Sequence, residues 1–113
     1  MIYLDTSALV KLVATEAESP ALRRYLGTRS DKRWFTAALT RTELIRAVSR
    51  TREPAALEHA RTILTSLDLV ALSDRLLDAA ATLAPAIDAV VTYDDRMATA
   101  VRESGMMLAQ PAN

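Results

Sequence analysis

The sequence predicts an α/β domain of three layers (α/β/α), with helices on both faces of a central, mainly parallel sheet of four to five strands. Short, uninterrupted apolar runs alternate with longer segments whose apolar residues recur at helical spacing. Strands that are apolar along their whole length are buried on both faces, which is typical of parallel sheets. Half of the 113 residues are apolar, and only two glycines and four prolines interrupt them. We therefore expect one domain over residues 1–113.

The predicted elements follow one another as strand and helix along the chain. The expected strands are short apolar runs at 2–4, 34–36, 69–72, 89–93 and, as an edge strand, 107–109. The expected helices carry an apolar stripe and cover 6–14, 19–27, 40–50, 54–67, 73–84 and 95–104.

Capping residues and helix breakers set the ends of these helices. Ser19 and Pro20 predict the start of the second helix, as an N-cap and a first-turn proline, and Gly27 ends it. Thr40 opens the third helix and Pro54 the fourth.

The same signals recur in the second half of the chain. Ser73 caps the fifth helix and Pro85 stops it. Gly105 follows the last helix, in the position that favours glycine. Repeats, linkers and a second domain are not evident.

The composition excludes several classes of protein. The chain has no cysteine, so it contains neither a disulfide framework nor a thiolate metal site. Its uncharged apolar stretches are shorter than a membrane span. The opening residues lack the basic flank and the cleavage site of a signal peptide. We expect a soluble, cytoplasmic protein without a membrane partner.

Charge is unevenly distributed although the formal net charge is zero. The segment 23–52 holds nine lysines or arginines and two acids, whereas the rest of the chain holds five basic and twelve acidic residues. A basic segment of this kind either faces a phosphate backbone or forms a solvated helical face. The sequence leaves both explanations open.

Three acids stand at comparable places: Asp5 after the first strand, Glu43 in the third helix, and Asp94 after the strand at 89–93. In parallel sheets, ligands bind beyond the carboxyl ends of the strands. Carboxylates about 4 Å apart repel by roughly 4 kcal/mol per pair at an effective dielectric of 20, so gathering them requires a cation. An all-oxygen ligand set favours Mg²⁺, with Mn²⁺ as the alternative. The chemistry expected there is attack on a phosphate by a metal-activated water.

Helix capping is the alternative explanation for each acid. Asp5 precedes a helix and can serve as its N-cap, and one of the pair Asp94 and Asp95 can cap the last helix. Glu43 completes a capping box with Thr40. The residues alone do not separate capping from metal binding.

Polar residues near these acids are candidates for a second layer of contacts. Ser7 and Thr92 are hydroxyls within two residues of an acid, and they can orient a metal-bound water or a phosphate. Arg46 and Arg96 are candidates for contact with the phosphate backbone. The plainer alternatives are strand-end hydroxyls and solvated helix residues.

Three motifs resemble one known family in their order along the chain. They are IYLDTSALVKL at 2–12, LTRTELIRAV at 39–48 and DAVVTYDDRM at 88–97. Together they resemble the PIN-domain nucleases, and more narrowly the VapC toxins of bacterial VapBC toxin–antitoxin modules. The resemblance covers nearly the whole chain. Each motif alone is moderately specific, and the ordered set is strong.

The resemblance implies a PIN-like fold and a Mg²⁺-dependent endoribonuclease toxin of a type II toxin–antitoxin system. The implied substrate is RNA, such as tRNA or rRNA, and the implied partners are a VapB-type antitoxin and a second copy in a homodimer. Asp5, Glu43 and Asp94 match the family's first, second and fourth acids. Ser7 and Thr92 match hydroxyls often found near the site.

The third acid of the family has no clear counterpart. In the family it lies in a helix just before the fourth strand, whereas here Pro85 runs almost directly into the strand, so a segment near 85–87 is missing. Either the chain is a shortened member of the family or its sequence omits residues there. Asp95 is the only plausible local replacement, since Asp88 is expected roughly 20 Å from Asp94. The alternative function is a catalytically impaired PIN-like module that binds RNA or the antitoxin without cleavage.

Overall fold

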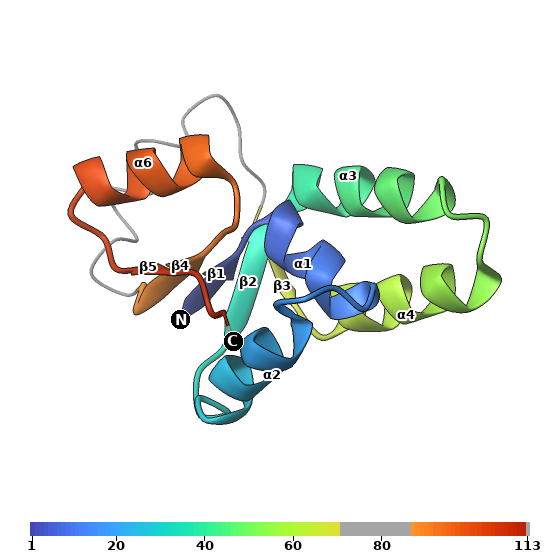
Figure 1. Ribbon diagram of the computed structural model, residues 1–113, viewed down its shortest axis with the longest axis horizontal. Coiled ribbons are helices and arrows are strands. Elements are labelled where there is room, and N and C mark those ends of the chain that lie inside the picture. The colour runs from blue at the N-terminus through green and yellow to red at the C-terminus, as the bar shows by residue number, and fades with distance from the viewer. Residues whose placement is uncertain (71–86, 113) are drawn as a thin grey trace.

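The computed structural model describes residues 1–70 and 87–112, and Figure 1 shows their arrangement. The strands are β1 (Ile2–Leu4), β2 (Trp34–Ala37), β3 (Asp68–Val70), β4 (Ala89–Val91) and β5 (Leu108–Ala109). The helices are α1 (Thr6–Val13), α2 (Ser19–Gly27), α3 (Ala38–Ser49), α4 (Pro54–Thr65) and α6 (Asp95–Glu103). None of these described helices is long and apolar enough to cross a membrane. The helix predicted at 73–84 and the end of the strand predicted at 69–72 lie outside the described residues.

The described strands form one five-stranded sheet in the order β3-β2-β1-β4-β5, and each pair is parallel. Ile2 of β1 lies opposite Trp34 of β2 on one side and opposite Ala89 of β4 on the other. The central position of β1 brings the residues that follow β1, β2 and β4 to one edge of the sheet. The predicted α/β class and the mainly parallel sheet are confirmed.

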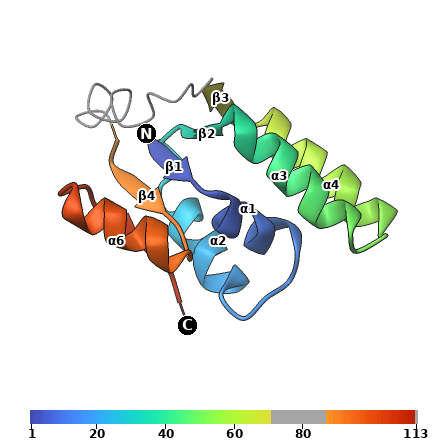
Figure 2. The same ribbon diagram turned by 90° about the horizontal axis from the view of Figure 1, so that it is seen from above.

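The core lies between the sheet and the helices that cover it. Figures 1 and 2 show α1 and α2 beside the sheet with α3 and α4 next to them, while α6 lies near β4 and β5. The largest fully buried apolar side chains come from several of these elements: Ile2, Leu4, Leu9, Leu22, Leu44 and Val91. Tyr3 points to the opposite face of β1, where its ring packs edge-on against Phe35 at 5.2 Å. Burial of the central strand therefore fixes the position at which Asp5 emerges.

The start of α3 differs from the prediction. β2 extends to Ala37 and passes directly into α3 at Ala38, and the N-cap residue Ala37 makes no side-chain capping bond. Thr40 is consequently buried inside the first turn instead of opening the helix. The predicted capping box between Thr40 and Glu43 is wrong, because Thr40 does not occupy the N-cap position.

Ser19 also has a different role from the one predicted. The N-cap of α2 is Glu18, which makes no side-chain capping bond, and Ser19 is the first helical residue. The fully buried Ser19 hydroxyl accepts the backbone N–H of Glu16 at 2.9 Å and lies 2.6 Å from the backbone oxygen of Lys11. Ser19 therefore fastens the α1–α2 connection to the end of α1.

Candidate active site

Asp5 is fixed at the carboxyl end of the central strand by both its backbone and its side chain. Its N–H donates to the backbone oxygen of Val91 at 3.1 Å, which continues the pairing of β1 with β4 by one residue. Its carboxylate Oδ1 accepts the N–H of Thr6 at 2.5 Å, as the N-cap of α1. Asp5 is therefore a cap, and the cap holds the carboxylate at the sheet edge.

Two hydroxyls converge on the other carboxylate oxygen of Asp5. Thr92 Oγ1 donates to Oδ2 at 2.5 Å, and Ser7 Oγ donates to the same atom at 3.0 Å. Thr92 is fully buried, so its hydroxyl cannot exchange this partner for bulk water. These are the two hydroxyls that the sequence placed near the acids, and the structure brings both to Asp5.

The same hydroxyls also hold the segment that follows β4. Thr92 Oγ1 accepts the N–H of Asp94 at 3.1 Å, and Ser7 Oγ accepts the N–H of Tyr93 at 2.8 Å. The two oxygens lie 3.3 Å apart. Ser7 and Thr92 thus join the start of α1 to the start of α6, with Asp5 between them.

Glu43 reaches this edge from α3. Its Oε2 accepts the hydroxyl of Thr6 at 2.7 Å, and the side chain is exposed. Thr6 follows Asp5 directly, so this hydrogen bond places Glu43 beside Asp5. The sequence did not single out Thr6; its only signal was its position between an acid and the hydroxyl of Ser7.

Asp94 and Asp95 have different roles. Asp94 Oδ1 accepts the N–H of Arg96 at 2.9 Å and caps α6. Asp95 lies in the first turn, and its exposed carboxylate has no partner within residues 1–70 and 87–112. The structure therefore shows that Asp94 is the cap, and that the Asp95 carboxylate is not needed for capping.

The three acids share one edge without forming a closed cluster. Across the described ranges, no three acidic, histidine or cysteine side chains come close enough together to hold a metal ion. The cap on Arg96 turns one oxygen of Asp94 toward α6, and Thr6 engages one oxygen of Glu43. The donor set is nevertheless all oxygen and delivered by three elements, which is the chemistry that Mg²⁺ and Mn²⁺ require.

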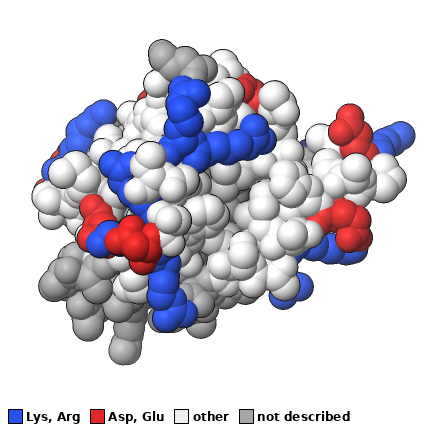
Figure 3. All heavy atoms as spheres, turned by 90° about the horizontal axis from the view of Figure 1, so that it is seen from below, with Lys and Arg blue, Asp and Glu red and all other residues white. Residues whose placement is uncertain are grey.

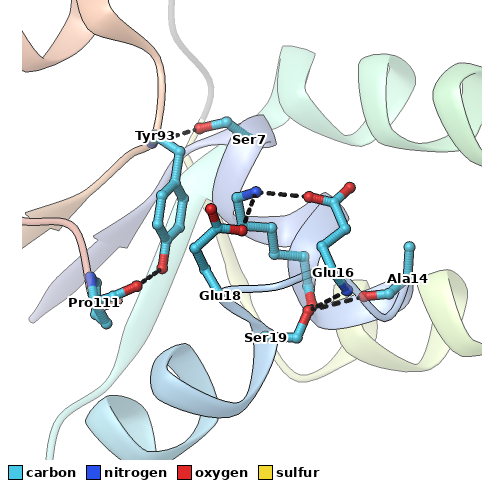
Figure 4. Close-up of polar contacts among 8 residues, drawn as sticks. Ser7, Ala14, Glu16, Glu18, Ser19, Tyr93 and Pro111 are labelled. Carbon is cyan, nitrogen blue, oxygen red and sulfur yellow. Dashed lines mark hydrogen bonds and ion pairs between the residues drawn. The ribbon is translucent and has the colours of Figure 1, made fainter. Parts of the chain in front are cut away.

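A half-buried lysine, Lys11, contacts the segment after β4 through Tyr93, and Figure 4 shows Tyr93 with Glu16 and Glu18. Lys11 Nζ, on a side chain only 14% exposed, forms ion pairs with Glu16 at 2.6 Å and Glu18 at 2.9 Å. The same ammonium lies 4.8 Å from the ring centre of Tyr93, whose hydroxyl donates to the backbone oxygen of Pro111 at 2.7 Å. This network was not predicted, because its members are scattered over the whole length of the chain.

The network shifts the pKa values of its members. The hydrogen bonds to Glu16 and Glu18 raise the pKa of Lys11, and the bond from Lys11 lowers the pKa of Glu18. Burial raises the pKa of the Tyr93 phenol. Lys11 therefore remains a cation over the whole physiological range and keeps its contact with Tyr93.

The basic segment 23–52 divides between two surfaces. Its first part lies on and near α2, where lysine and arginine side chains gather in the view of Figure 3. The second part, including Arg46, lines a hollow between α3 and α4, and this hollow shares no lining residue with the one beside α2. Arg46 and Arg96 are both exposed. The structure thus does not place the whole segment on one face.

Asp88 lies at the opposite end of the sheet. Its carboxylate pairs with the amino group of Met1 at 2.5 Å and with Lys32 at 3.5 Å. The bond from the Met1 amino group, together with the Lys32 charge, lowers the pKa of Asp88. Its place at this end of the sheet agrees with the prediction that Asp88 does not replace the family's third acid.

Comparison with known proteins gives a family match and several similar sequences. Residues 2–104 match the PIN domain family. Ribonuclease VapC46 of Mycobacterium tuberculosis (strain ATCC 25618 / H37Rv) is 39% identical, over 98% of this chain and 98% of that protein. Ribonuclease VapC47 of Mycobacterium tuberculosis (strain CDC 1551 / Oshkosh) is 36% identical, over 98% of this chain and 97% of that protein. Ribonuclease VapC35 of the same strain is 37% identical, over 98% of this chain and 97% of that protein.

These relatives are longer than the present chain. The alignments run over 130 to 133 positions, which exceeds the 113 residues of this chain. The relatives therefore contain positions for which this chain has no counterpart. This difference agrees with a missing segment, and its place near residues 85–87 remains a prediction.

Proposed function

The chain belongs to the PIN-domain family, and from this premise we propose that it is a metal-dependent endoribonuclease toxin of a type II toxin–antitoxin system. One structural observation supports this proposal in addition to the sequence similarity. Asp5, Glu43 and Asp94 reach the same sheet edge from three elements, and hydroxyls fasten them there. Capping alone does not require Glu43 to lie beside Asp5.

We assign Asp5, Glu43 and Asp94 as the residues that hold the metal, Mg²⁺ or Mn²⁺. Glu43 and Asp94 each use one carboxylate oxygen in a hydrogen bond and keep the other without a partner in the described part of the chain. The free oxygens are the donors available to a hard cation. When bound, the metal lowers the pKa of a water and stabilises charge on the phosphate under attack.

The other polar residues orient these carboxylates and the RNA. Thr92 and Ser7 fix Asp5 Oδ2, which limits the directions in which its lone pairs point. Arg96 presents its backbone N–H to Asp94 and its exposed side chain to solvent, where it can meet a phosphate. Asp95 supplies negative charge beside Asp94 and is a further candidate donor.

Cleavage of labelled RNA tests the proposal. We expect the chain to cut structured RNA such as tRNA or an rRNA fragment in Mg²⁺ or Mn²⁺, and to stop when the metal is chelated. Asp5→Asn and Glu43→Gln keep the shape of each side chain and remove its charge, so both should abolish cleavage while leaving the fold intact. Cleavage that persists in a chelator or in both variants would refute the assignment.

We also propose the partners that accompany such a toxin: a VapB-type antitoxin and a second copy of this chain. The acids at the sheet edge offer a site for a basic side chain of the antitoxin, which would compete with the metal. A structure of the complex in which the antitoxin tail lies far from Asp5, Glu43 and Asp94 would contradict this proposed binding of a basic side chain. Mass measurement in solution decides whether the chain is a homodimer.

A second candidate function is a PIN-like module that binds RNA or the antitoxin without cutting. Two observations favour it: the acids do not form a closed cluster among the described residues, and the chain is shorter than its relatives. This module would bind RNA equally well with and without Mg²⁺ and would show no cleavage. The proposed nuclease and this module therefore differ in one assay.

A further inference from the structure

The α3–α4 pair carries a hollow that the proposed chemistry does not use. Its volume is about 1360 Å³, and five arginines line it from both helices and the turn between them. These are Arg41, Arg46, Arg50, Arg52 and Arg61. The other polar lining residues are Thr42, Ser49 and Thr65, and none of the lining residues in the described chain is acidic. Such a concentration of one sign of charge raises the local concentration of anions.

Within residues 1–70 and 87–112, most of these arginines are not neutralised by another side chain. Arg41, Arg46, Arg50 and Arg52 have no ion pair or hydrogen bond from their side chains within the described ranges, and Arg61 has only an exposed contact of 3.3 Å with Glu58. Exposed charges of one sign repel one another, so their convergence is unfavourable for folding alone. A bound polyanion would relieve this repulsion.

The turn between α3 and α4 supplies an independent observation. Arg52 has a φ of 56°, and it is the non-glycine residue with positive φ in the described chain. This left-handed conformation favours glycine, because the side chain of any other residue crowds the backbone. An arginine at this position accepts backbone strain and adds a fifth cation to the hollow. Stability alone would select glycine.

The hollow begins next to the candidate active site. Arg41 and Thr42 line it and immediately precede Glu43, whose carboxylate is bonded to Thr6. From Thr42 to Arg50 the helix rises by about 12 Å, at 1.5 Å per residue. Phosphate charges recur about every 3.4 Å along each strand of a duplex, so this length covers more than one phosphate.

We propose that this hollow, the arginine hollow, binds the phosphate backbone of the RNA on one side of the cleaved bond. The inference rests on the proposed function, and it names a surface that selects RNAs long enough to reach from the acids to the far end of α3. Guanidinium groups suit this task, because their planar donors match phosphate oxygens. Bases are not read here, so binding depends on length and salt and little on sequence.

Binding of fluorescent RNA tests the proposal without cleavage. The probes are a single-stranded RNA of about 20 nucleotides and a trinucleotide, measured by anisotropy in a chelator. The double variant Arg50→Gln/Arg61→Gln removes one cation from each helix, far from the acids. At about 0.1 M salt we expect its Kd for the long RNA to rise about tenfold, and the slope of log K against log salt to fall by about 1.4, at 0.7 per lost contact.

The control and a second variant keep the test decisive. Arg23→Gln/Arg102→Gln removes the same charge from α2 and α6, outside the arginine hollow. Because exposed charges away from the binding surface contribute little, the Kd of this control for the long RNA should stay within about twofold of the wild-type value. Ser49→Arg adds a cation to the hollow and should tighten binding. Binding of the trinucleotide should change in none of the variants.

Several results would overturn the inference. One is an unchanged Kd in both hollow variants, and another is an equal loss in the control. A third is unchanged RNA binding with lost binding of poly-glutamate, which would assign the hollow to an acidic protein segment. The proposed nuclease activity is tested independently of the arginine hollow. RNA binding that depends on the hollow, without cleavage in Mg²⁺, would support the binding surface and refute the proposed catalysis.

Discussion

Asp94 caps α6 and is proposed to hold the metal, and a pair of substitutions can separate these two roles. One oxygen caps α6 through the N–H of Arg96, and the other is available to a metal. Asparagine caps a helix about as well as aspartate but carries no charge. We expect Asp94→Asn to keep the stability of the chain and to abolish RNA cleavage. Asp94→Ala should abolish cleavage and also cost about 1 kcal/mol in unfolding free energy.

Urea unfolding and a cleavage assay on the same preparations measure both effects. Wild-type cleavage by Asp94→Asn would show that Asp94 is only a cap. In that case Asp95, whose carboxylate has no partner in the described part of the chain, would be the next residue to replace.

Thr92 links Asp5 to the segment that follows β4. Its buried hydroxyl donates to Asp5 and accepts the N–H of Asp94. Thr92→Val keeps the shape and leaves two polar groups without this partner, so we expect the unfolding free energy to fall by about 1 to 3 kcal/mol. Thr92→Ser keeps the hydroxyl and should lose much less. A smaller loss in Thr92→Val than in Thr92→Ser would show that the methyl group, and not the hydroxyl, matters.

The sequence predicted the residues that follow strand ends better than those within helices. Asp5, Ser7 and Thr92 lie within three residues of the end of a buried strand, so the parallel sheet alone brings them together. The position of the Glu43 side chain, in contrast, depends on the residue at which α3 begins. Because Ala37 has no capping side chain, this boundary left no signal, and the bond between Thr6 and Glu43 could not be foreseen.

The α3–α4 turn offers a test in which stability and function change in opposite directions. Arg52→Gly relieves the crowding of the left-handed backbone, which costs a residue with a side chain about 1 to 2 kcal/mol, although glycine loses more entropy on folding. We expect a net gain of about 0.5 to 1 kcal/mol in unfolding free energy, measured in urea. Affinity for long RNA should fall at the same time. Unchanged stability would mean that φ at this position carries no strain, and unchanged affinity would remove Arg52 from the hollow.

The connection between α1 and α2 should make stability depend on pH through Lys11. The folded pKa of Glu18 is lowered, so its contribution is present above its ordinary value of 4.5 and is lost as the pH falls through the folded value. The folded pKa of Lys11 is raised, so its contribution is present below 10.5 and is lost as the pH rises through the folded value.

Lys11→Met should therefore destabilise the chain most between these limits, and the difference from wild type should shrink toward both extremes. Unfolding in urea at a series of pH values measures this difference. A difference that is constant with pH would mean that Lys11 acts through packing of its apolar stem and not through its charge.

At the scale of the whole molecule, alternation of apolar runs and amphipathic segments was enough to predict the fold. Each described strand overlaps a predicted one, and the parallel order follows from crossover helices between them. The ion pairs of Lys11 and the arginine hollow could not be predicted from the sequence, because they depend on how helices pack and not on the periodicity of apolar residues.

The central claim is that Asp5, Glu43 and Asp94 form one metal site, and Mn²⁺ binding tests it most directly. Isothermal titration should be run on the chain and on Asp5→Asn, Glu43→Gln and Asp94→Asn, with Asp88→Asn as a control at the other end of the sheet. We expect each of the three variants to bind Mn²⁺ at least about tenfold more weakly, and the control to bind as the wild type does. Wild-type affinity in all three variants, or no binding of Mn²⁺ by the chain itself, would contradict the claim.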